Sequence, residues 1–466
     1  QTSQSAMVII DHTTGYVVGC VGGLGEKKSA RGFNRATQAV RQTGSAIKPI
    51  AVLAPGIDKK TFTASTMYND EPTTFNDGSE SGYSPTDNDE YIGEITVRRA
   101  VESSQNIPFV KMMEAIGPSN SVKYLKKMGI TSLTDKDETL SLALGGLDKG
   151  ITPLEMAGAY ATIANDGQYI EPTFYTKIET AKGKNLMKSK QKKTKVFSKE
   201  VAYILKNLLT QPVLGQNGTA TYCKISGVDV AAKTGTTDEN YDRWLCGFTP
   251  YYTAVTWFGY DQNESVEFNQ RNPAGLIWAN VMSRIHTGLN SAKFEKPNTV
   301  FSSTICAETG KKARSGCQNT YTEYYLWLTT PDLCDKHTGS EYKDNSDSST
   351  DIKDNVTEIV KGITNEIDAT EPARTDTQTN TITNSTTTNT TNNTKTNTNS
   401  TVNKPNNSTT NTPTNSNKNN NTTNKNHNTS NTTESNDKTT NTGQTTNSTT
   451  EETPKSNTVQ ENTNLQ

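Results

Sequence analysis

Three short motifs in this 466-residue sequence contain side chains that could carry out acyl transfer. They are Ser45-Ala46-Ile47-Lys48, Ser104-Gln105-Asn106 and Lys233-Thr234-Gly235. A serine hydroxyl is a poor nucleophile unless a neighbouring base takes its proton. A lysine amine can be that base when burial or a second cation lowers its pKa. The motifs together therefore predict a serine nucleophile that is activated by lysine.

The Ser-x-x-Lys pattern is weak evidence by itself, because it also occurs at 189–192, 340–343 and 435–438. Those copies lie in a lysine run, a polar loop and a polar tail. Ser45 differs because it follows a glycine and opens an apolar segment, 44–55, that we interpret as a helix. At i and i+3, Ser45 and Lys48 would share one helix face. The alternative for this pair alone is an ordinary helix N-cap, and the other two motifs argue against it.

The second and third motifs supply the remaining groups that such a reaction needs. Lys233 would be the second cation, and Ser104 would bridge the two ammonium groups and relay a proton. The amide of Asn106 would hold a substrate peptide bond. Gly235 would let a substrate backbone approach a strand edge.

Two further features of the third motif suit an anionic substrate. The hydroxyls of Thr234 and Thr236, with Lys233, would bind a terminal carboxylate. The backbone N–H groups of Ser45 and Thr236 would form an oxyanion hole.

The apolar patterning predicts how the chain positions these motifs. Residues 7–10 and 16–18 form a β-hairpin pattern, and three more strands are expected at 228–236, 243–249 and 252–261. Helical patterns dominate the middle of the chain, whereas 57–92 looks like irregular surface. We expect an α+β fold: a five-stranded antiparallel sheet flanked by helices, with an inserted all-helical lobe and a cleft between the lobes.

Composition divides the chain into two unlike parts. The last aromatic residue is Tyr342, and the remainder is dominated by Asn, Thr and Ser. Such a segment cannot bury enough apolar surface to offset its ordering entropy. We therefore predict a globular domain at 1–345, a short helix or linker at 346–368, and a disordered tail at 369–466. The net charge of −2 and the lack of a basic block argue against nucleic acid, and no apolar run is long enough to span a membrane.

The motif set resembles that of the penicillin-recognising serine enzymes. More narrowly, the chain looks like the transpeptidase domain of a class A penicillin-binding protein. The likeness covers roughly 6–290 and weakens towards about 340. It extends beyond the three motifs to segments 33–36, 41–45, 144–146, 152–167, 233–238, 242–244 and 258–261. The departures are Ala232, Ile47 and Thr43, none of which removes a chemical group.

The resemblance implies a D,D-transpeptidase that cross-links peptidoglycan stem peptides through an acyl-enzyme and is acylated by β-lactams. It assigns catalysis to Ser45, Lys48 and Ser104. It implies no cofactor and no metal. Substrate binding falls to Asn106, Lys233, Thr234, Gly235 and Thr236.

Two alternative functions share this acylation chemistry. A D,D-carboxypeptidase of the same fold would pass the acyl group to water, and a non-catalytic β-lactam-sensing module would stall after acylation. A serine β-lactamase is disfavoured because no Glu lies in a recognisable deacylating setting.

The resemblance also sets expectations for location and partners. The chain begins at Gln1 without an initiator Met, so we expect a membrane anchor and a glycosyltransferase domain upstream. We place the protein at the extracytoplasmic face of the bacterial membrane, with stem peptides, β-lactams and cell-wall synthesis proteins as partners.

Cys306, Cys317, Cys334 and His337 form a separate cluster in the sequence. Three cysteines with a Cys-x-x-His ending are compatible with zinc. The spacings of 11 and 17 residues between the cysteines, without a Cys-x-x-Cys pair, argue against it. An extracytoplasmic location favours a disulfide, with free thiols as the other option.

Overall fold

The computed structural model describes residues 2–27, 30–87, 90–267 and 271–342, which fall within one compact unit. The predicted linker at 346–368 and the predicted tail at 369–466 lie outside these residues. Within the described ranges, no helix is long and apolar enough to cross a membrane.

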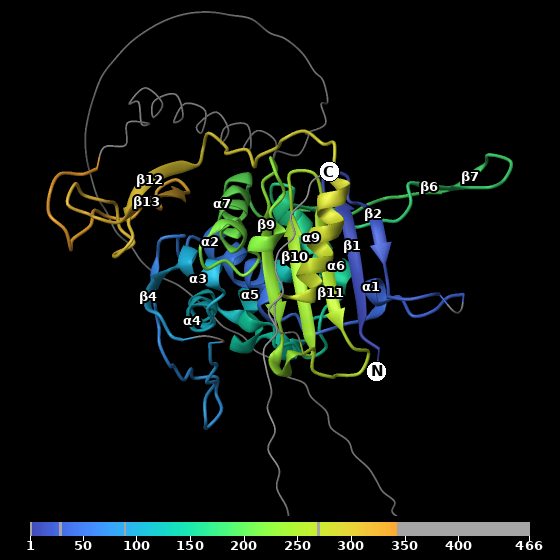
Figure 1. Ribbon diagram of the computed structural model, residues 1–466, viewed down its shortest axis with the longest axis horizontal. Coiled ribbons are helices and arrows are strands. Elements are labelled where there is room, and N and C mark those ends of the chain that lie inside the picture. Colours follow the sequence, from blue (N-terminus) through green and yellow to red (C-terminus); the bar gives the residue numbers. More distant parts are fainter. Residues whose placement is uncertain (1, 28–29, 88–89, 268–270, 343–466) are drawn as a thin grey trace, which may run out of the picture. The chain divides into compact units, whose positions relative to one another are not determined.

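A five-stranded sheet, antiparallel throughout, forms the centre of the molecule, as predicted (Figure 1). Its spatial order is β2-β1-β11-β10-β9, so that the N-terminal hairpin pairs with the last strand of the C-terminal trio. Strand β9 is therefore an edge strand. The bounds are β1 (Gln4–Asp11), β2 (Tyr16–Val21), β9 (Ala231–Thr236), β10 (Asp242–Phe248) and β11 (Thr253–Gly259).

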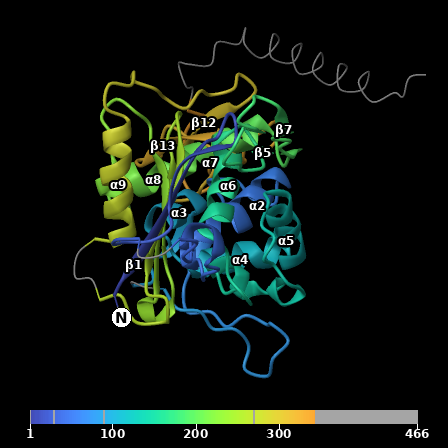
Figure 2. The ribbon, with the colours of Figure 1, turned by 90° about the vertical axis from the view of Figure 1, so that its right-hand side faces the viewer.

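Helices cover both faces of this sheet (Figure 2). Helix α9 (Pro273–Ile285) packs on one face, where Trp278 and Met282 are buried against the sheet. The helical lobe covers the other face through the fully buried face of α6 (Pro153–Ala164). The remaining helices are α1 (Arg35–Gln38), α2 (Ala54–Asp58), α3 (Val97–Ser103), α4 (Ile107–Ile116), α5 (Pro118–Lys127), α7 (Lys199–Leu209) and α8 (Gln211–Leu214).

Local capping signals place several of these helices where the sequence predicts them. Thr152 and Glu155 form a reciprocal capping box at the start of α6, with Pro153 at the first helical position. Ser198 caps α7, and Asn272 caps α9. In each case a short side chain accepts a hydrogen bond from a backbone N–H that has no partner within the helix.

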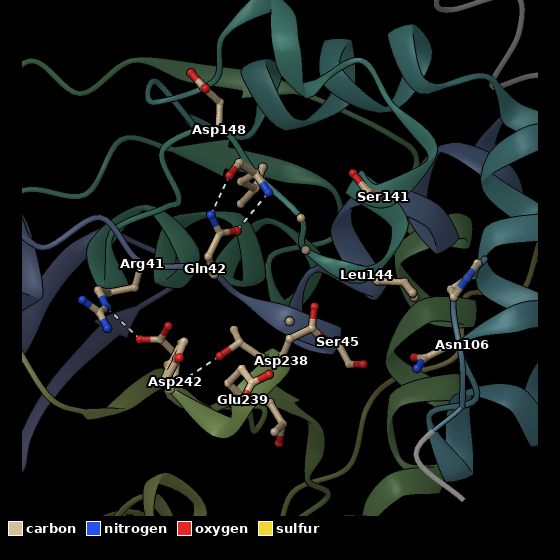
Figure 3. A pocket seen from close by; sticks show the side chains of 18 of the residues that line it. Arg41, Gln42, Ser45, Asn106, Ser141, Leu144, Asp148, Asp238, Glu239 and Asp242 are labelled. Carbon is tan, nitrogen blue, oxygen red and sulfur yellow. Dashed lines mark hydrogen bonds and ion pairs between the residues drawn. The ribbon is translucent and has the colours of Figure 1, made fainter. Parts of the chain in front are cut away.

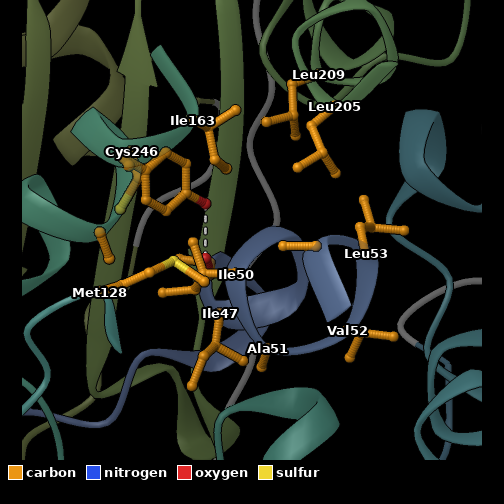
Figure 4. Close-up of a cluster of buried hydrophobic side chains, with 14 of the residues drawn as sticks. Ile47, Ile50, Ala51, Val52, Leu53, Met128, Ile163, Leu205, Leu209 and Cys246 are labelled. Atoms are coloured by element: carbon orange, nitrogen blue, oxygen red, sulfur yellow. Dashed lines mark hydrogen bonds between the residues drawn. The ribbon is translucent and has the colours of Figure 1, made fainter. Parts of the chain in front are cut away.

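The predicted helix at 44–55 is helical but not one regular element. It begins as a 3₁₀ helix over Gly44–Ile47, widens to a π-type turn over Pro49–Leu53, and becomes α2 only at Ala54. Pro49 and Pro55 lack the N–H groups that a regular i→i−4 ladder would need at these positions. The segment nevertheless lies within the apolar core, and Figure 4 shows Ile50, Val52 and Leu53 among the surrounding side chains.

The structure contains strands that periodicity did not predict. Strand β3 (Met67–Asp70) pairs with β4 (Gly93–Thr96), so the segment 57–92 is only partly irregular, and Phe75 within it is buried. These strands are too short and too far apart in sequence to give a local signal. The other unpredicted pairs are β5 (Gln168–Ile170) with β8 (Lys193–Lys195), β6 (Lys177–Glu179) with β7 (Asn185–Lys188), and β12 (Phe301–Cys306) with β13 (Thr320–Tyr325).

Candidate active site

Lys48 is a fully buried lysine whose ammonium contacts the second motif. Its Nζ donates to the carbonyl oxygens of Ser104 (2.7 Å) and Gln105 (2.9 Å) and to Oδ1 of Asn106 (2.7 Å). It also lies 3.4 Å from Ser104 Oγ and 4.8 Å from the centre of the Phe109 ring. The first and second motifs are therefore joined inside the protein, as the sequence predicts.

Lys233 of the third motif also contacts the second motif, through Ser104. Its Nζ donates to Ser104 Oγ at 2.7 Å and to the carbonyl oxygen of Thr234 at 3.1 Å. Ser104 thus lies between two lysines, and it adopts a left-handed conformation (φ 65°) at the end of α3. This arrangement is the bridge that the three motifs predict, in which one hydroxyl contacts both amines.

Burial of the two lysines favours their neutral forms. Loss of solvation holds the pKa of Lys48 well below its usual value, and the charge of Lys233 lowers that pKa further. Burial also lowers the pKa of Lys233, to about 7. A neutral amine has a free lone pair and can therefore accept a proton from a hydroxyl.

Asn106 is fixed by several contacts besides Lys48. Its Nδ2 donates to the carbonyl oxygen of Thr86 at 2.7 Å, and its backbone N–H donates to Asp87. Burial and the adjacent carboxyl of Asp70 raise the pKa of Asp87 to about 6. Asp70 and Asp87 were not predicted as site residues, because they lie in the segment interpreted as irregular surface.

Ser45 lines a cleft of about 1200 Å³ (Figure 3). The other walls include Asn106, the loop at Leu144–Gly146 and the end of β9 at Thr236. Lys48, Ser104 and Lys233 are buried. Among the described residues, the hydrogen bonds of Lys48 all go to 104–106 and none goes to Ser45.

Two glycines allow the segment that carries Ser45 to pack directly on β9. A Cβ at Gly235 would come within 2.5 Å of the Thr43 carbonyl oxygen and 2.8 Å of the Ala46 Cβ. A Cβ at Gly44, whose φ is +51°, would come within 2.1 Å of the Thr236 carbonyl oxygen. Gly235 therefore makes room for the Ser45 segment. The sequence analysis predicted a different role for Gly235, namely to let a substrate backbone approach the strand.

The two threonines of the third motif occupy different settings. Thr236 lines the cleft and accepts a hydrogen bond from Arg243 at 3.1 Å. The Thr234 hydroxyl donates to Thr219 at 2.9 Å. Ala232, one of the departures noted above, is fully buried in the cluster under α9 and does not crowd the cleft.

Residues that flank the motifs hold the segment around Ser45 in place, and some of them, such as Arg41 and Asp242, also line the cleft. The Tyr160 hydroxyl donates to the Ala46 carbonyl oxygen at 2.6 Å. Arg41 pairs with Asp242 at 2.7 Å, and the fully buried Trp244 donates to the Gln42 carbonyl oxygen at 2.8 Å. Buried polar contacts of this kind fix the backbone on both sides of Ser45.

The predicted disulfide is absent, because all six cysteines are free thiols in the described residues. The sulfurs of Cys306, Cys317 and Cys334 instead surround Nδ1 of His337 at 3.4–3.5 Å. The spacing argument missed this cluster because the loops that follow β12 and β13 bring the four residues together.

The fold and the three motifs define the class of this chain, the penicillin-recognising serine proteins. The family model described as penicillin binding protein transpeptidase domain matches residues 5–283, and the chain belongs to this family.

Relatives and solved structures agree with this assignment. Penicillin-binding protein 1A of Clostridium botulinum is 36% identical over 316 residues, which cover 66% of this chain and 38% of that relative. The chain therefore spans about two fifths of the length of that curated relative. Among solved structures, penicillin-binding protein 1A from Haemophilus influenzae is 25% identical with a TM-score of 0.62, covering 71% of this chain and 54% of that one. The PonA1 protein from Mycobacterium tuberculosis, solved in complex with penicillin V, is 25% identical with a TM-score of 0.54, covering 63% of this chain and 81% of that one.

Proposed function

We propose that this chain is a serine D,D-transpeptidase that cross-links peptidoglycan stem peptides and is acylated by β-lactams at Ser45. The observation that carries this proposal is the pair of buried lysines that share Ser104, next to a serine in an open cleft. Two buried amines at hydrogen-bond distance from one hydroxyl are suited to proton transfer and to binding an anion.

In the acylation step, Ser45 Oγ attacks the carbonyl carbon of the terminal D-Ala-D-Ala bond. Lys48 in its neutral form, which burial favours, accepts the hydroxyl proton as the new C–O bond forms. Ser104 donates a proton to the leaving nitrogen as the C–N bond breaks, and it is reprotonated from the lysine pair. D-Ala is released and the acyl group remains on Ser45.

In the second step, the amine of a neighbouring stem peptide attacks the ester carbonyl of the acyl-enzyme. A C–N bond forms, the ester C–O bond breaks, and the proton lost by the amine returns to Ser45 through the same lysine. A β-lactam follows only the first step, because its leaving nitrogen stays attached through the opened ring.

Substrate binding is assigned to the cleft side of the same groups. Asn106 holds the donor amide, while Lys233, Thr234 and Thr236 bind the terminal carboxylate at the edge of β9. Because β9 is an edge strand, an extended peptide can pair with it as an added strand. The N–H groups of Ser45 and Thr236 stabilise the oxyanion.

This substrate is found outside the cytoplasmic membrane, so we propose that the protein acts at the extracytoplasmic face of a bacterial cell. We also propose that the full-length protein carries a membrane anchor and a glycosyltransferase domain, and that it works with other cell-wall synthesis proteins.

Labelling with a fluorescent penicillin tests the proposal. The wild-type chain is expected to be labelled covalently and Ser45→Ala is expected to lose all labelling. Ser141→Ala, which changes another serine of the same cleft, should retain it. Labelling that survives Ser45→Ala would overturn the site assignment.

A donor stem peptide, supplied with and without an acceptor amine, separates the alternative functions. A cross-linked product that depends on the acceptor supports the transpeptidase. Hydrolysis at the same rate in both conditions indicates a D,D-carboxypeptidase, and acylation by penicillin without any peptide turnover indicates a sensing module.

A further inference from the structure

A second constellation lies in the C-terminal part of the described chain, beyond the residues 5–283 that the family model matches. It is built on the antiparallel hairpin of β12 and β13 and the loops that follow each strand. Cys306 ends β12, Cys317 lies in the turn before β13, and Cys334 and His337 lie in the loop after it. The ligand atoms of these four residues all lie within 4.8 Å of one another.

The distances within this cluster match a tetrahedral metal site. Nδ1 of His337 is 3.5 Å from the sulfurs of Cys306 and Cys317 and 3.4 Å from that of Cys334. A tetrahedral zinc ion with Zn–S of about 2.3 Å and Zn–N of about 2.0–2.1 Å would hold each sulfur about 3.5 Å from the nitrogen. The three nitrogen–sulfur distances therefore match those of a tetrahedral zinc site, and the three sulfurs lie within 4.8 Å of one another.

Neighbouring groups are oriented as supports of such ligands. The backbone N–H of Arg314 donates to the Cys317 sulfur at 3.3 Å, and the Thr309 hydroxyl lies 3.5 Å from the Cys334 sulfur. Hydrogen bonds of this kind stabilise thiolates. On the far side of the imidazole, Nε2 of His337 lies 3.7 Å from a carboxylate oxygen of Glu308. Glu308, which also pairs with Lys336 at 2.7 Å, thus lies near the nitrogen that points away from the sulfurs, where a carboxylate often supports a zinc-bound histidine.

We propose that Cys306, Cys317, Cys334 and His337 bind one Zn²⁺ in a closed, structural site. Three thiolates and an imidazole in tetrahedral array are a preferred ligand set for zinc, whereas calcium and magnesium require oxygen ligands. All four positions are taken by protein side chains, so no site is left for a reacting water or a substrate. Binding the ion releases the three thiol protons, and the loaded site carries a net charge of −1.

The zinc ion stabilises the small subdomain formed by the β12–β13 hairpin and its loops, which has little core of its own. The hairpin is attached to the transpeptidase body by Glu323, which is fully buried and pairs with Arg98 of α3 at 2.5 Å. Tyr325 adds a hydrogen bond to Ser65 at 2.7 Å. Because α3 leads directly into Ser104, the metal holds in place a hairpin that supports the helix before the site.

The metal content of the purified 466-residue chain tests this proposal. The protein is purified from a metal-replete culture and denatured, and the metal that it releases is measured by mass spectrometry. We expect about one zinc per chain. Cys317→Ser should lose most of that zinc. Cys20→Ser is the matched control, because it removes another partly exposed free thiol that is far from the cluster in sequence, and it should keep the metal.

A second measurement keeps the proposal testable if Cys317→Ser does not fold. The wild-type chain, stripped with a chelator and titrated with Co²⁺, should develop the visible absorption of tetrahedral cobalt bound to thiolates. Zinc should abolish this signal and restore the melting temperature lost on stripping. A wild-type chain that contains no zinc and gives no such cobalt spectrum would overturn the proposal, as would a disulfide between two of these cysteines in the freshly purified protein.

Discussion

At the scale of single residues, the proposed mechanism depends on the charge state of two lysines that share one hydroxyl. Lys48 must be neutral to accept the proton of Ser45, and its lowered pKa allows this. Lys233 must be charged to bind a carboxylate, and burial lowers its pKa to about 7. The two lysines therefore require opposite protonation states within one hydrogen-bond network.

This conflict predicts how the acylation rate depends on pH. As the pH rises above about 7, Lys233 loses its charge, so the second-order rate of acylation by penicillin should fall. As the pH falls, Lys48 becomes protonated and can no longer act as a base, so the rate should fall again. The measurement is the rate of fluorescent-penicillin labelling across this range.

Lys233→Arg is the informative variant for the high-pH limb. Arginine keeps its charge to much higher pH, so the decline above about pH 7 should vanish even if the maximal rate is lower. A decline with the same midpoint in Lys233→Arg would show that another group causes it.

The contacts among Lys48, Ser104 and Lys233 were predictable from the sequence, but the residues that support them were not. Ser45, Lys48, Ser104 and Lys233 follow from chemistry that few residue types can perform. Asp87, by contrast, supports the site by accepting a hydrogen bond from the backbone N–H of Asn106, and its carboxyl lies beside that of Asp70. No local pattern distinguishes such an aspartate from the solvent-exposed ones around it.

At the scale of elements, the position of Ser45, the proposed nucleophile, depends on how closely the 3₁₀ helix at Gly44–Ile47 approaches β9. The approach is possible only because Gly44 and Gly235 have no side chains. The N-cap signals of α6, α7 and α9 are local and predicted those helices well. The irregular helix at 44–58 was not predicted in detail, because two prolines and tertiary packing together determine its geometry.

Gly235→Ala should separate the helix from the strand. Its new methyl group would overlap the Thr43 carbonyl, which belongs to the backbone and cannot turn aside. Overpacking of this kind typically lowers the free energy of unfolding by about 1–3 kcal/mol. A displaced nucleophile can cost up to about 10²-fold in rate. Thermal unfolding and penicillin labelling measure the two effects.

Gly19→Ala in β2 is the control for this prediction. The nearest atom to its new Cβ would be the flexible tip of Ile9 at 3.3 Å, and β2 is an edge strand far from the cleft. It should change both quantities little. Equal effects of the two substitutions would mean that the contact between the helix and β9 is not what positions Ser45.

At the scale of the whole molecule, the composition of the chain predicts that the globular domain ends near residue 345. The last aromatic residue is Tyr342, and the sequence beyond it is dominated by Asn, Thr and Ser. The five-stranded sheet and its inserted helical lobe were predicted because long apolar patterns mark their elements. The β12–β13 unit was not, because its cohesion depends on ligand atoms contributed by separate loops and on one buried ion pair with α3.

Truncation tests this division of the chain. A chain that ends at residue 342 should melt at the same temperature as the full chain and react with penicillin at the same rate. The reason is compositional: the short helix or linker predicted at 346–368 is expected at the surface, and beyond residue 374 the only aliphatic residues larger than Ala are Ile382, Val402, Val459 and Leu465. So few apolar side chains add almost nothing to a core.

A chain that ends at residue 329 is the matched comparison, since it removes only thirteen further residues. It lacks Cys334 and His337, and with them the hydrogen bond from the Cys334 N–H to the Lys312 carbonyl oxygen. It should melt at a lower temperature and lose bound zinc. If truncation at 342 already lowers the melting temperature as much as truncation at 329, residues 343–466 contribute to the fold and the predicted boundary is wrong.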